Sequence, residues 1–318
     1  MSVILVAGGA GFIGSQLSEN LLNEGHKVIC LDNLITGSKE NIENLLQNTN
    51  FEFIQEDVTK TSWQSQLSTL NYVFHLASPA SPNKKSERSY INHPIETLMA
   101  NSLGTYNLLE LVKEKGAAFL YASSSEIYGE PKVSPQNEDY FGNVNPNGVR
   151  SVYDEGKRFG EAMTMAYVRK FGVDARMIRI FNTFGPKMQA DDGRVVSNFI
   201  NQAIKNEKIT IYGDGKQTRS FCYVDDMING LKRAMFSKNS KGEVLNLGNP
   251  DERTILELAT IIKEMTSSAS IISYEELPED DPKERKPDIS KAKRILQWEP
   301  AVKLEEGLRK TIEYFKNN

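Results

Sequence analysis

Strand-like and helix-like segments alternate through the first half of the chain, and this alternation constrains the fold more than any other feature. A strand followed by a helix, repeated several times, is the pattern of a parallel sheet with helices on both faces. The sequence therefore predicts an α/β fold. The strand-like runs lie at 3–7, 27–32, 51–57, 72–77, 117–123 and 174–181, and helical periodicity fits 12–24, 90–115 and 150–171.

The second half of the chain has shorter elements. "KITIYG" at 208–213 and "EVLNLGN" at 243–249 are strand-like, whereas the charged segment 276–288 has the composition of a disordered linker. Because more strand and helix sequence follows that segment, we expect a smaller C-terminal α/β lobe built on the sheet of the first domain. The predicted domains are 1–183 and 184–318, with some crossing of the chain between them.

A glycine-rich stretch, "AGGAGFIG", follows the first strand and opens the first helix. Glycines there allow a tight turn and a close approach of the backbone to a pyrophosphate, which then lies at the positive end of the helix. Turns also collect glycine without binding a ligand, but the strand before this stretch and the helix after it favour binding. We predict a Rossmann doubly wound parallel sheet in which Gly8, Gly11 and Gly14 contact a dinucleotide.

Asp32 ends the second strand, 18 residues after Gly14, near the distance at which an acidic side chain receives the adenosine ribose. No arginine follows it to hold a 2′-phosphate, so the predicted cofactor is NAD and not NADP. Asp57 closes the third strand, where an adenine contact and simple turn chemistry both stay open. The same loops supply further candidate cofactor-binding residues, namely Phe12, Ile13, Asn33, Val58, Leu76 and Ala77.

A tyrosine and a lysine stand four residues apart in "SVYDEGKRFGE" at 151–161. On a helix, Tyr153 and Lys157 share one face, with β-carbons about 5–6 Å apart. An ammonium group beside the phenol would lower the pKa of the tyrosine toward the working pH, as a general base requires. This spacing also occurs by chance in many helices. Ser124, at the end of the fifth strand, supports the catalytic interpretation, although a serine cluster can also cap a helix.

Charge, cysteine content and hydropathy exclude several classes of function. The net charge of −4 comes from interspersed acids and bases, so we expect neither nucleic acid nor a membrane surface as a partner. Cys30 and Cys222 have no cysteine or histidine at metal-ligand spacing, which argues against a metal site and a disulfide framework. No stretch reaches the roughly 18 apolar residues that span a bilayer. We predict a cytoplasmic protein without a metal.

With these motifs in view, the chain resembles the extended short-chain dehydrogenase/reductases of the NAD-dependent epimerase/dehydratase family, which modify nucleotide sugars. Within that family it looks most like the UDP-glucuronate decarboxylases. The resemblance runs almost end to end. It rests on "GGAGFIGS", "HLASPASP", "SSSEIYGEP", "EDYFGNVNP", "YDEGKR", "RIFNTFGP", "DGRVVSNFI", "YGDGKQTRSFCYVDD", "NLGNP", "ERKPDI" and "WEP".

The resemblance implies roles that spacing cannot give. Tyr153 and Lys157, with Ser124, would remove the proton of the sugar 4-hydroxyl while NAD takes the hydride. Glu126 and Arg285 would flank carbon 5 as catalytic groups. The UDP-sugar would be bound by Asn182, Val195, Tyr212, Arg219 and Arg285. Judged by sequence alone, Arg285 could equally be a solvated surface charge, and Arg219 could equally be a surface salt-bridge partner. Relatives commonly dimerise, so we expect a homodimer through a four-helix interface built from the helices at 90–115 and 150–171.

Three departures from the decarboxylase pattern bear on the sugar. Met99 stands where those enzymes carry a lysine that faces the substrate, although a methionine can also simply fill the core. The loop 83–91 is longer than in those relatives and should overhang the sugar. The segment 58–66, "VTKTSWQSQ", lacks a Pro-Leu-Tyr-like turn. We expect the last two changes to lie near the hexose.

The leading interpretation is an enzyme that oxidises carbon 4 of a UDP-sugar with NAD and then acts at carbon 5 or 6, with UDP-glucuronate decarboxylation as the nearest precedent. The alternative is an oxidoreductase, isomerase or 4-epimerase for a UDP-N-acetyl-6-deoxyhexosamine, as in pseudaminic acid synthesis. From a different class, a non-catalytic NAD-sensing module would lack the tyrosine or the lysine, and both are present.

Overall fold

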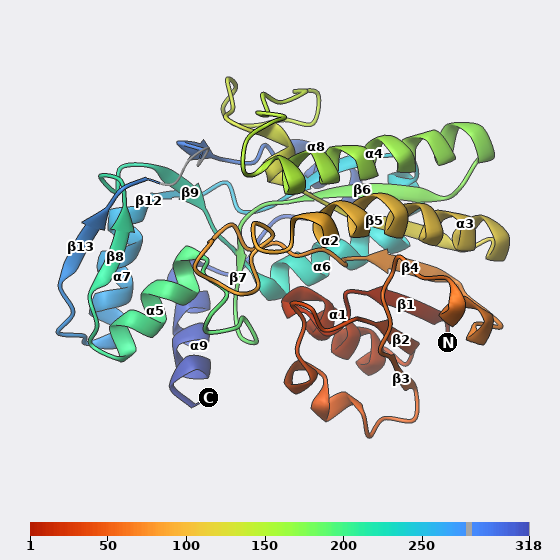
Figure 1. Ribbon diagram of the computed structural model, residues 1–318, viewed down its shortest axis with the longest axis horizontal. Helices are drawn as coiled ribbons and strands as arrows, with labels where there is room; N and C mark the ends of the chain where they lie inside the picture. The colour runs from red at the N-terminus through yellow and green to blue at the C-terminus, as the bar shows by residue number, and fades with distance from the viewer. Residues whose placement is uncertain (278–281, 318) are drawn as a thin grey trace.

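The computed structural model describes residues 1–277 and 282–317, and a parallel sheet with helices on both faces lies at its centre (Figure 1). Within the described residues this sheet has seven strands in the order β11-β6-β5-β4-β1-β2-β3, and every neighbouring pair is parallel. The predicted Rossmann doubly wound α/β fold is confirmed. The strands are β1 (Val3–Ala7), β2 (Lys27–Leu31), β3 (Phe51–Ile54), β4 (Tyr72–His75), β5 (Ala118–Ser124), β6 (Ala175–Ile180) and β11 (Val244–Leu247).

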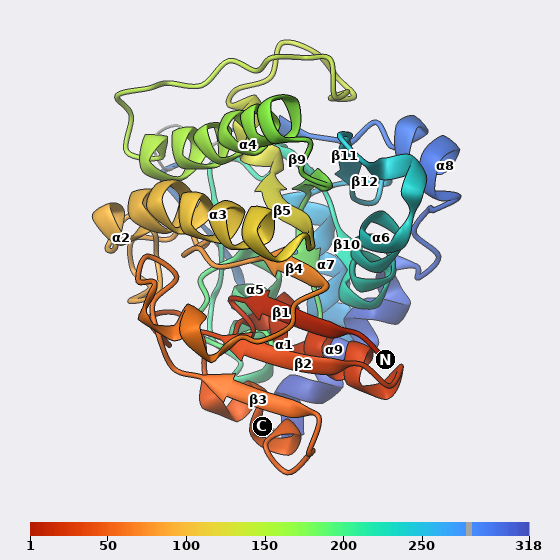
Figure 2. The same cartoon turned by 90° about the vertical axis from the view of Figure 1, so that its right-hand side faces the viewer.

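The two faces of the sheet are covered by different helices (Figure 2). On one face pack α3 (Thr105–Lys115) and α4 (Ser151–Phe171), and on the other pack α1 (Phe12–Asn23) and α6 (Val224–Phe236). Each face therefore has its own apolar core, around Leu108 on the first and around Met227 on the second. Because the strands are buried on both sides, their sequences are almost continuously apolar.

The helix predicted at 90–115 begins later and is interrupted. It comprises α2 (Pro94–Met99), a π-helical turn at Ala100–Gly104 and α3. Pro94 is the first helical residue, because a proline ring disfavours helical backbone in the residue before it. Residues 90–93 belong to the preceding loop. The strands predicted to run to 57 and 77 end at Ile54 and His75, where the chain turns into the loops after β3 and β4.

Small sheets form most of the second half. β8 (Ile209–Tyr212) pairs with β13 (Ile272–Glu275), β7 (Thr183–Phe184) pairs with β10 (Cys222–Tyr223), and β9 (Thr218–Ser220) lies between β12 (Glu252–Thr254) and β14 (Glu284–Arg285). The helices around them are α5 (Val195–Ile204), α7 (Ile255–Thr266), α8 (Ser290–Leu296) and α9 (Leu304–Asn317).

The chain crosses between the two halves. From the second half, β11 pairs with β6 as the last strand of the central sheet, and α6 packs on that sheet. The boundary between residues 183 and 184 stays a prediction. Of the charged segment 276–288, residues 278–281 lie outside the described part of the chain. The rest of that segment includes β14, which is paired with β9 and so does not have the free conformation of a linker.

Candidate active site

A large cavity opens at the carboxyl ends of the central strands, beside the point where the strand order reverses between β1 and β4. Open α/β sheets bind their ligands at such a point. The cavity has a volume of about 910 Å³, and its walls come from both halves of the chain. A smaller cavity of about 70 Å³ adjoins it and shares Gly8, Gly11, Thr36, Leu76 and Ser78 with it. Together the two form one elongated site.

The glycine loop lies where the two cavities meet. Gly8 has a φ of +82°, and a side chain there would lie 2.7 Å from the backbone nitrogen of Ala77. A side chain at Gly14 would collide with the carbonyl oxygen of Gly8, so this glycine lets α1 pack against the loop. Helix α1 begins after Gly11, whose lack of a side chain leaves the first N–H groups uncapped. With Phe12 and Ile13 these glycines line the large cavity.

Asp32 and Asp57 lie in the smaller cavity, which Asn33, Val58, Leu76 and Ala77 also line. The Asp32 carboxylate accepts hydrogen bonds from the backbone nitrogens of Ala10 (3.0 Å) and Leu34 (2.8 Å). Burial raises its pKa nevertheless. Asp57 accepts from the Asn33 amide (2.7 Å) and the Thr59 hydroxyl (2.6 Å), and these bonds outweigh partial burial and lower its pKa. Asp57 therefore holds a turn and also faces the cavity.

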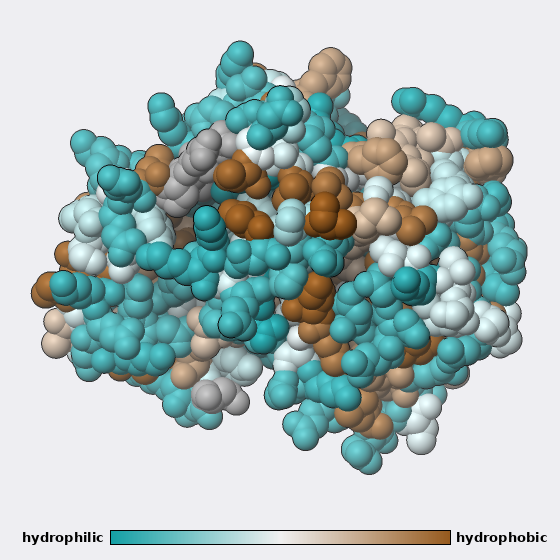
Figure 3. Space-filling view, in the orientation of Figure 1, coloured by the Kyte–Doolittle hydropathy of each residue, from teal (hydrophilic) through white to brown (hydrophobic). Residues whose placement is uncertain are grey.

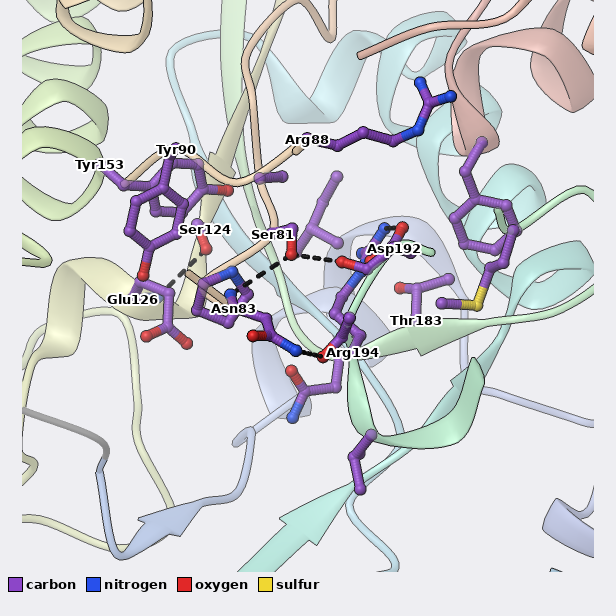
Figure 4. A pocket seen from close by; sticks show the side chains of 18 of the residues that line it. Ser81, Asn83, Arg88, Tyr90, Ser124, Glu126, Tyr153, Thr183, Asp192 and Arg194 are labelled. Carbon is purple, nitrogen blue, oxygen red and sulfur yellow. Dashed lines mark hydrogen bonds and ion pairs between the residues drawn. The ribbon is translucent and has the colours of Figure 1, made fainter. Parts of the chain in front are cut away.

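Tyr153, Lys157 and Ser124 all line the large cavity. Figure 4 shows Tyr153 and Ser124 near each other at one wall. The Lys157 ammonium lies 5.5 Å from the centre of the Tyr153 ring and donates to the carbonyl of Ala122 (2.8 Å). The Ser124 hydroxyl accepts from the backbone nitrogen of Glu126 (3.2 Å), so this serine also has the capping role that the sequence left open. Helix α4 and the end of β5 bring the three side chains together.

The prediction that the ammonium lowers the pKa of the tyrosine is wrong for the protein by itself. Burial raises the pKa of Tyr153 to about 12, more than the hydrogen bond with Ser124 lowers it. Burial also lowers the pKa of Lys157 to about 7. The reason is that burial, the largest cause of both shifts, makes the charged form of each side chain costly.

Glu126 is the centre of a buried charge cluster next to Tyr153. Its carboxylate pairs with Arg150 and with Arg285 (3.2 Å). The two guanidinium groups, Arg285 more than Arg150, outweigh burial and lower the pKa of Glu126. Arg285 is 1% exposed and also donates to the carbonyl of Gly129 (2.8 Å), so the alternative of a solvated surface charge is wrong. Glu126 and Arg150 line the large cavity, whereas Arg285 lies behind them.

The remaining predicted substrate residues line the far part of the same cavity. They are Asn182, Val195, Tyr212 and Arg219. Arg219 is 9% exposed and donates to the carbonyls of Thr218 (2.8 Å) and Pro282 (2.6 Å), so its guanidinium lies inside the protein and not on the solvated surface. These two bonds hold the guanidinium at the wall of the cavity, and a guanidinium is a group that binds phosphates well.

Several lining residues were missed by the sequence reasoning. Arg150 precedes α4, and Arg194 precedes α5 and forms two 2.6 Å bonds with Asp192. Tyr90 stacks on Tyr153 and is 1% exposed, and among the described residues its hydroxyl has no hydrogen-bond partner. Arg194 lies inside the quoted motif "DGRVVSNFI", and Tyr90 lies inside the long loop, so both signals were available. Arg150 had no local signal.

The three departures from the decarboxylase pattern fall in different places. The loop 83–91 lines the large cavity beside Tyr153, as expected. Met99 lines neither cavity and is 39% exposed on α2, so neither the substrate-facing position nor the core position is right. The segment 58–66 is also not near the hexose end. Val58 and Trp63 are its buried residues and belong to the core on the α3 face of the sheet, and Val58 alone of the segment lines a cavity, the smaller one.

The residues present fit NAD. The glycine cradle excludes any side chain where a pyrophosphate would lie, α1 offers uncapped N–H groups, and Asp32 faces the position of an adenosine ribose. Among the described residues, no group of three or more histidine, cysteine or acidic side chains could hold a metal ion. None of the described helices has the length and apolar character to cross a membrane.

Comparisons with known proteins agree with this geometry. The model of the NAD dependent epimerase/dehydratase family matches residues 4–248. UDP-glucuronic acid decarboxylase 1 of Danio rerio is 52% identical over 312 residues, 98% of this chain and 72% of that protein. UDP-glucuronic acid decarboxylase 3 of Arabidopsis thaliana is 50% identical over 314 residues, 98% of this chain and 89% of that protein. A crystal structure of UDP-glucuronic acid 4-epimerase from Bacillus cereus, in complex with UDP-glucuronic acid and NAD, is 31% identical with a TM-score of 0.88 over 99% of both chains. This chain belongs to the NAD-dependent epimerase/dehydratase family, and its cofactor is NAD.

Proposed function

We propose that this enzyme decarboxylates UDP-glucuronate to UDP-xylose. Oxidation at carbon 4 creates a ketone β to the carboxylate at carbon 6. Loss of carbon dioxide then leaves an enolate whose charge the ketone oxygen takes up. A solvent proton returns to carbon 5 and the hydride returns to carbon 4, so the cycle consumes no oxidant. The chemistry therefore needs a base at the 4-hydroxyl and a donor at the same oxygen.

Tyr153 and Ser124 meet that need. The phenolate form of Tyr153 takes the proton of the 4-hydroxyl and the resulting phenol later returns it, while the serine hydroxyl donates to the oxygen that becomes negative. NAD, when bound, supplies the hydride acceptor, and the positive charge of its oxidised ring lowers the pKa of a neighbouring phenol. Lys157, held by the carbonyl of Ala122, stabilises the phenolate from the other side.

Glu126 and Arg285 belong on the carbon 5 side of the hexose in this proposal. Glu126 is held ionised by two arginines, so it repels the carboxylate of the substrate but not the neutral carbon dioxide that leaves. Arg285 is not on the cavity wall, and we assign it the role of holding Glu126 in place. We assign binding of the UDP moiety to Asn182, Val195, Tyr212 and Arg219, and their position on the wall of the same cavity supports this.

The single observation that carries the proposal is the buried Tyr153–Lys157–Ser124 group with ionised Glu126 beside it in the same cavity. The identity of about 50% to decarboxylases supports it. Incubation with UDP-glucuronate should release carbon dioxide and give a nucleotide sugar lighter by that mass. UDP-glucose, which has no carboxylate, should give no gas. Unchanged UDP-glucuronate would contradict the proposal.

A second candidate is 4-epimerisation of the same sugar. The similar Bacillus cereus structure is that of an epimerase, and both reactions begin with oxidation at carbon 4. An epimerase would return an isomer of unchanged mass, which chromatography resolves from the substrate. The 6-deoxyhexosamine alternative rested on Met99, and it loses that support because Met99 does not line the cavity.

We also propose the homodimer through four helices. Apolar side chains are exposed along α2 and α3, at Ile95, Met99, Leu103 and Tyr106, and Phe159 is exposed on α4. Figure 3 shows brown side chains over α2 and the neighbouring end of α4. A patch of this kind is typical of an interface. Light scattering should give a dimer, and Ile95→Glu should give a monomer. A monomeric unaltered protein would refute the interface.

The cytoplasm stays the proposed compartment. Cys30 and Cys222 are buried free thiols, which a reducing environment preserves. Fractionation of cells that express the tagged chain tests this directly, and recovery from a secreted fraction would contradict it.

A further inference from the structure

The segment Ser81–Ile91 crosses the mouth of the large cavity and is tied to both of its sides. At its start, the Ser81 hydroxyl donates to the carbonyl of Asp192, and the Asn83 amide donates to the carbonyl of Gly193 (3.3 Å). Further along, the backbone nitrogen of Tyr90 bonds back to the carbonyl of Ser81 (3.0 Å), which closes the segment into a compact loop. The loop therefore has a fixed place over the cavity.

Arg88 extends from this loop away from Tyr90 and Tyr153 (Figure 4). Its Nη1 donates to the backbone carbonyls of Thr36 (2.9 Å) and Gly37 (3.4 Å). Its Nε donates to both carboxylate oxygens of Asp191, at 3.2 and 3.4 Å. One guanidinium thus joins the loop that follows Asp32 to the segment that leads into α5.

The bonds of Arg88 to Thr36, Gly37 and Asp191 lie next to the predicted cofactor site. Thr36 and Gly11 line both cavities, and Arg88 lines the large one. A dinucleotide with its ribose at Asp32 and its reactive ring at Tyr153 spans both cavities and passes the glycine loop between them. The Arg88 bridge ends on Thr36, which lines both cavities, so one end of the bridge lies beside that path.

We propose that Arg88 is a positioning residue that retains NAD between catalytic cycles by tying the loop after Asp32 to Asp191. The reason for such a residue rests on the proposed function, since a reaction that returns its hydride gains nothing by releasing the cofactor. Most of the effect should come from the charge-assisted bonds to the two carbonyls, because Asp191 is 58% exposed and its ion pair is screened by water.

The test is the rate of NAD release from the purified enzyme without substrate. Labelled NAD is loaded, an excess of unlabelled NAD is added, and the label that stays bound is followed over time. In Arg88→Ala the release should be about 10-fold or more faster, which corresponds to about 1.4 kcal/mol. Asp191→Asn should have a smaller effect, and the double variant should be no faster than Arg88→Ala alone.

Arg253→Ala is the matched control. Arg253 also bonds one carboxylate, of Asp251, and one carbonyl, of Glu252, but it lines neither cavity. Its variant should release NAD at the unaltered rate. UDP affinity, measured by calorimetry, and the melting temperature show whether the fold and the substrate end are intact in every variant.

Two results would overturn the inference. Release from Arg88→Ala at the rate of the unaltered enzyme means that the bridge does not retain the cofactor. A loss of UDP affinity as large as the gain in NAD release means that Arg88 acts on the substrate end instead. Neither the rate of NAD release nor the UDP affinity depends on turnover. An enzyme that does not decarboxylate UDP-glucuronate would therefore refute the proposed function, and the role of Arg88 could still be tested.

Discussion

The rings of Tyr90 and Tyr153 lie parallel, with their centres 4.9 Å apart and an angle of 9° between their planes. Tyr90 comes from the loop over the cavity, whereas Tyr153 comes from α4. The loop therefore fixes the plane of the proposed base from outside its own helix. A buried hydroxyl without a partner, such as that of Tyr90, costs stability in the free protein.

Replacement of Tyr90 separates these two effects. Tyr90→Phe keeps the stacked ring and removes the unpaired hydroxyl, so the free energy of unfolding should rise by about 1 kcal/mol. Tyr90→Leu removes the stacked pair and should lower it by about 2 kcal/mol. Denaturant unfolding of the substrate-free protein measures both. A less stable Tyr90→Phe variant would show that the hydroxyl has a partner in solution.

Tyr153→Phe should abolish turnover without weakening UDP binding. The variant keeps the ring and its stacking but cannot accept the proton, so turnover should fall by about 10²–10⁴-fold. Calorimetry with UDP should give the affinity of the unaltered enzyme. Tyr274→Phe, at an exposed tyrosine on β13, is the control and should keep full activity. Residual turnover near the control value would remove Tyr153 from the mechanism.

The ion pair between Glu126 and Arg285 should be strongly coupled. Glu126→Gln removes the carboxylate that pairs with both buried guanidinium groups, and Arg285→Met removes the guanidinium that acts most strongly on Glu126. Each single variant should lose about 3–5 kcal/mol of unfolding free energy, and the double variant should lose clearly less than the sum. The same cycle at the exposed pair Lys293 and Glu299 should show almost no coupling. Additive losses at Glu126 and Arg285 would mean that the two do not interact.

Asp154 should make stability depend on pH. Burial and the nearby negative charge of Glu126 raise the pKa of Asp154 to about 8, against an ordinary value of 3.8. Between these values the folded protein holds a proton that the unfolded chain has released, so stability falls as pH rises. Asp154→Asn lacks this titration, and its stability relative to the unaltered protein should grow from pH 4 to pH 8 by about 1 kcal/mol or more. Parallel stability curves for the two proteins would show that Asp154 is ionised when folded.

The parts of the site that sequence could predict are those set by local backbone. Gly8 and Gly14 are required by a turn and a close packing contact, and both follow from their position after a strand. Tyr153 and Lys157 share a face because helical spacing dictates it. The parallel direction of the strands followed from their alternation with helices. These features depend on residues close together in the sequence, so a local sequence pattern can predict them.

The parts that the residues alone left open or missed depend on contacts between distant segments. Arg285 stands in a charged run that is typical of solvated surface, yet Glu126, 159 residues away, forms its ion pair in the interior. No arginine follows Asp32 in the sequence, but Arg88 reaches the loop after it from 52 residues along the chain. The start of α2 did have a local signal, because Pro94 marks the first helical residue. The helical periodicity of 90–115 obscured that signal.

The most direct test of the central claim uses UDP-glucuronate that carries deuterium at carbon 4. If Tyr153 drives removal of the hydride to a resident cofactor and its return to the same carbon, the product should lose carbon dioxide, keep the deuterium at carbon 4 and form more slowly than from unlabelled substrate. Carbon dioxide release with loss of the label to solvent, or no release at all, would contradict the account.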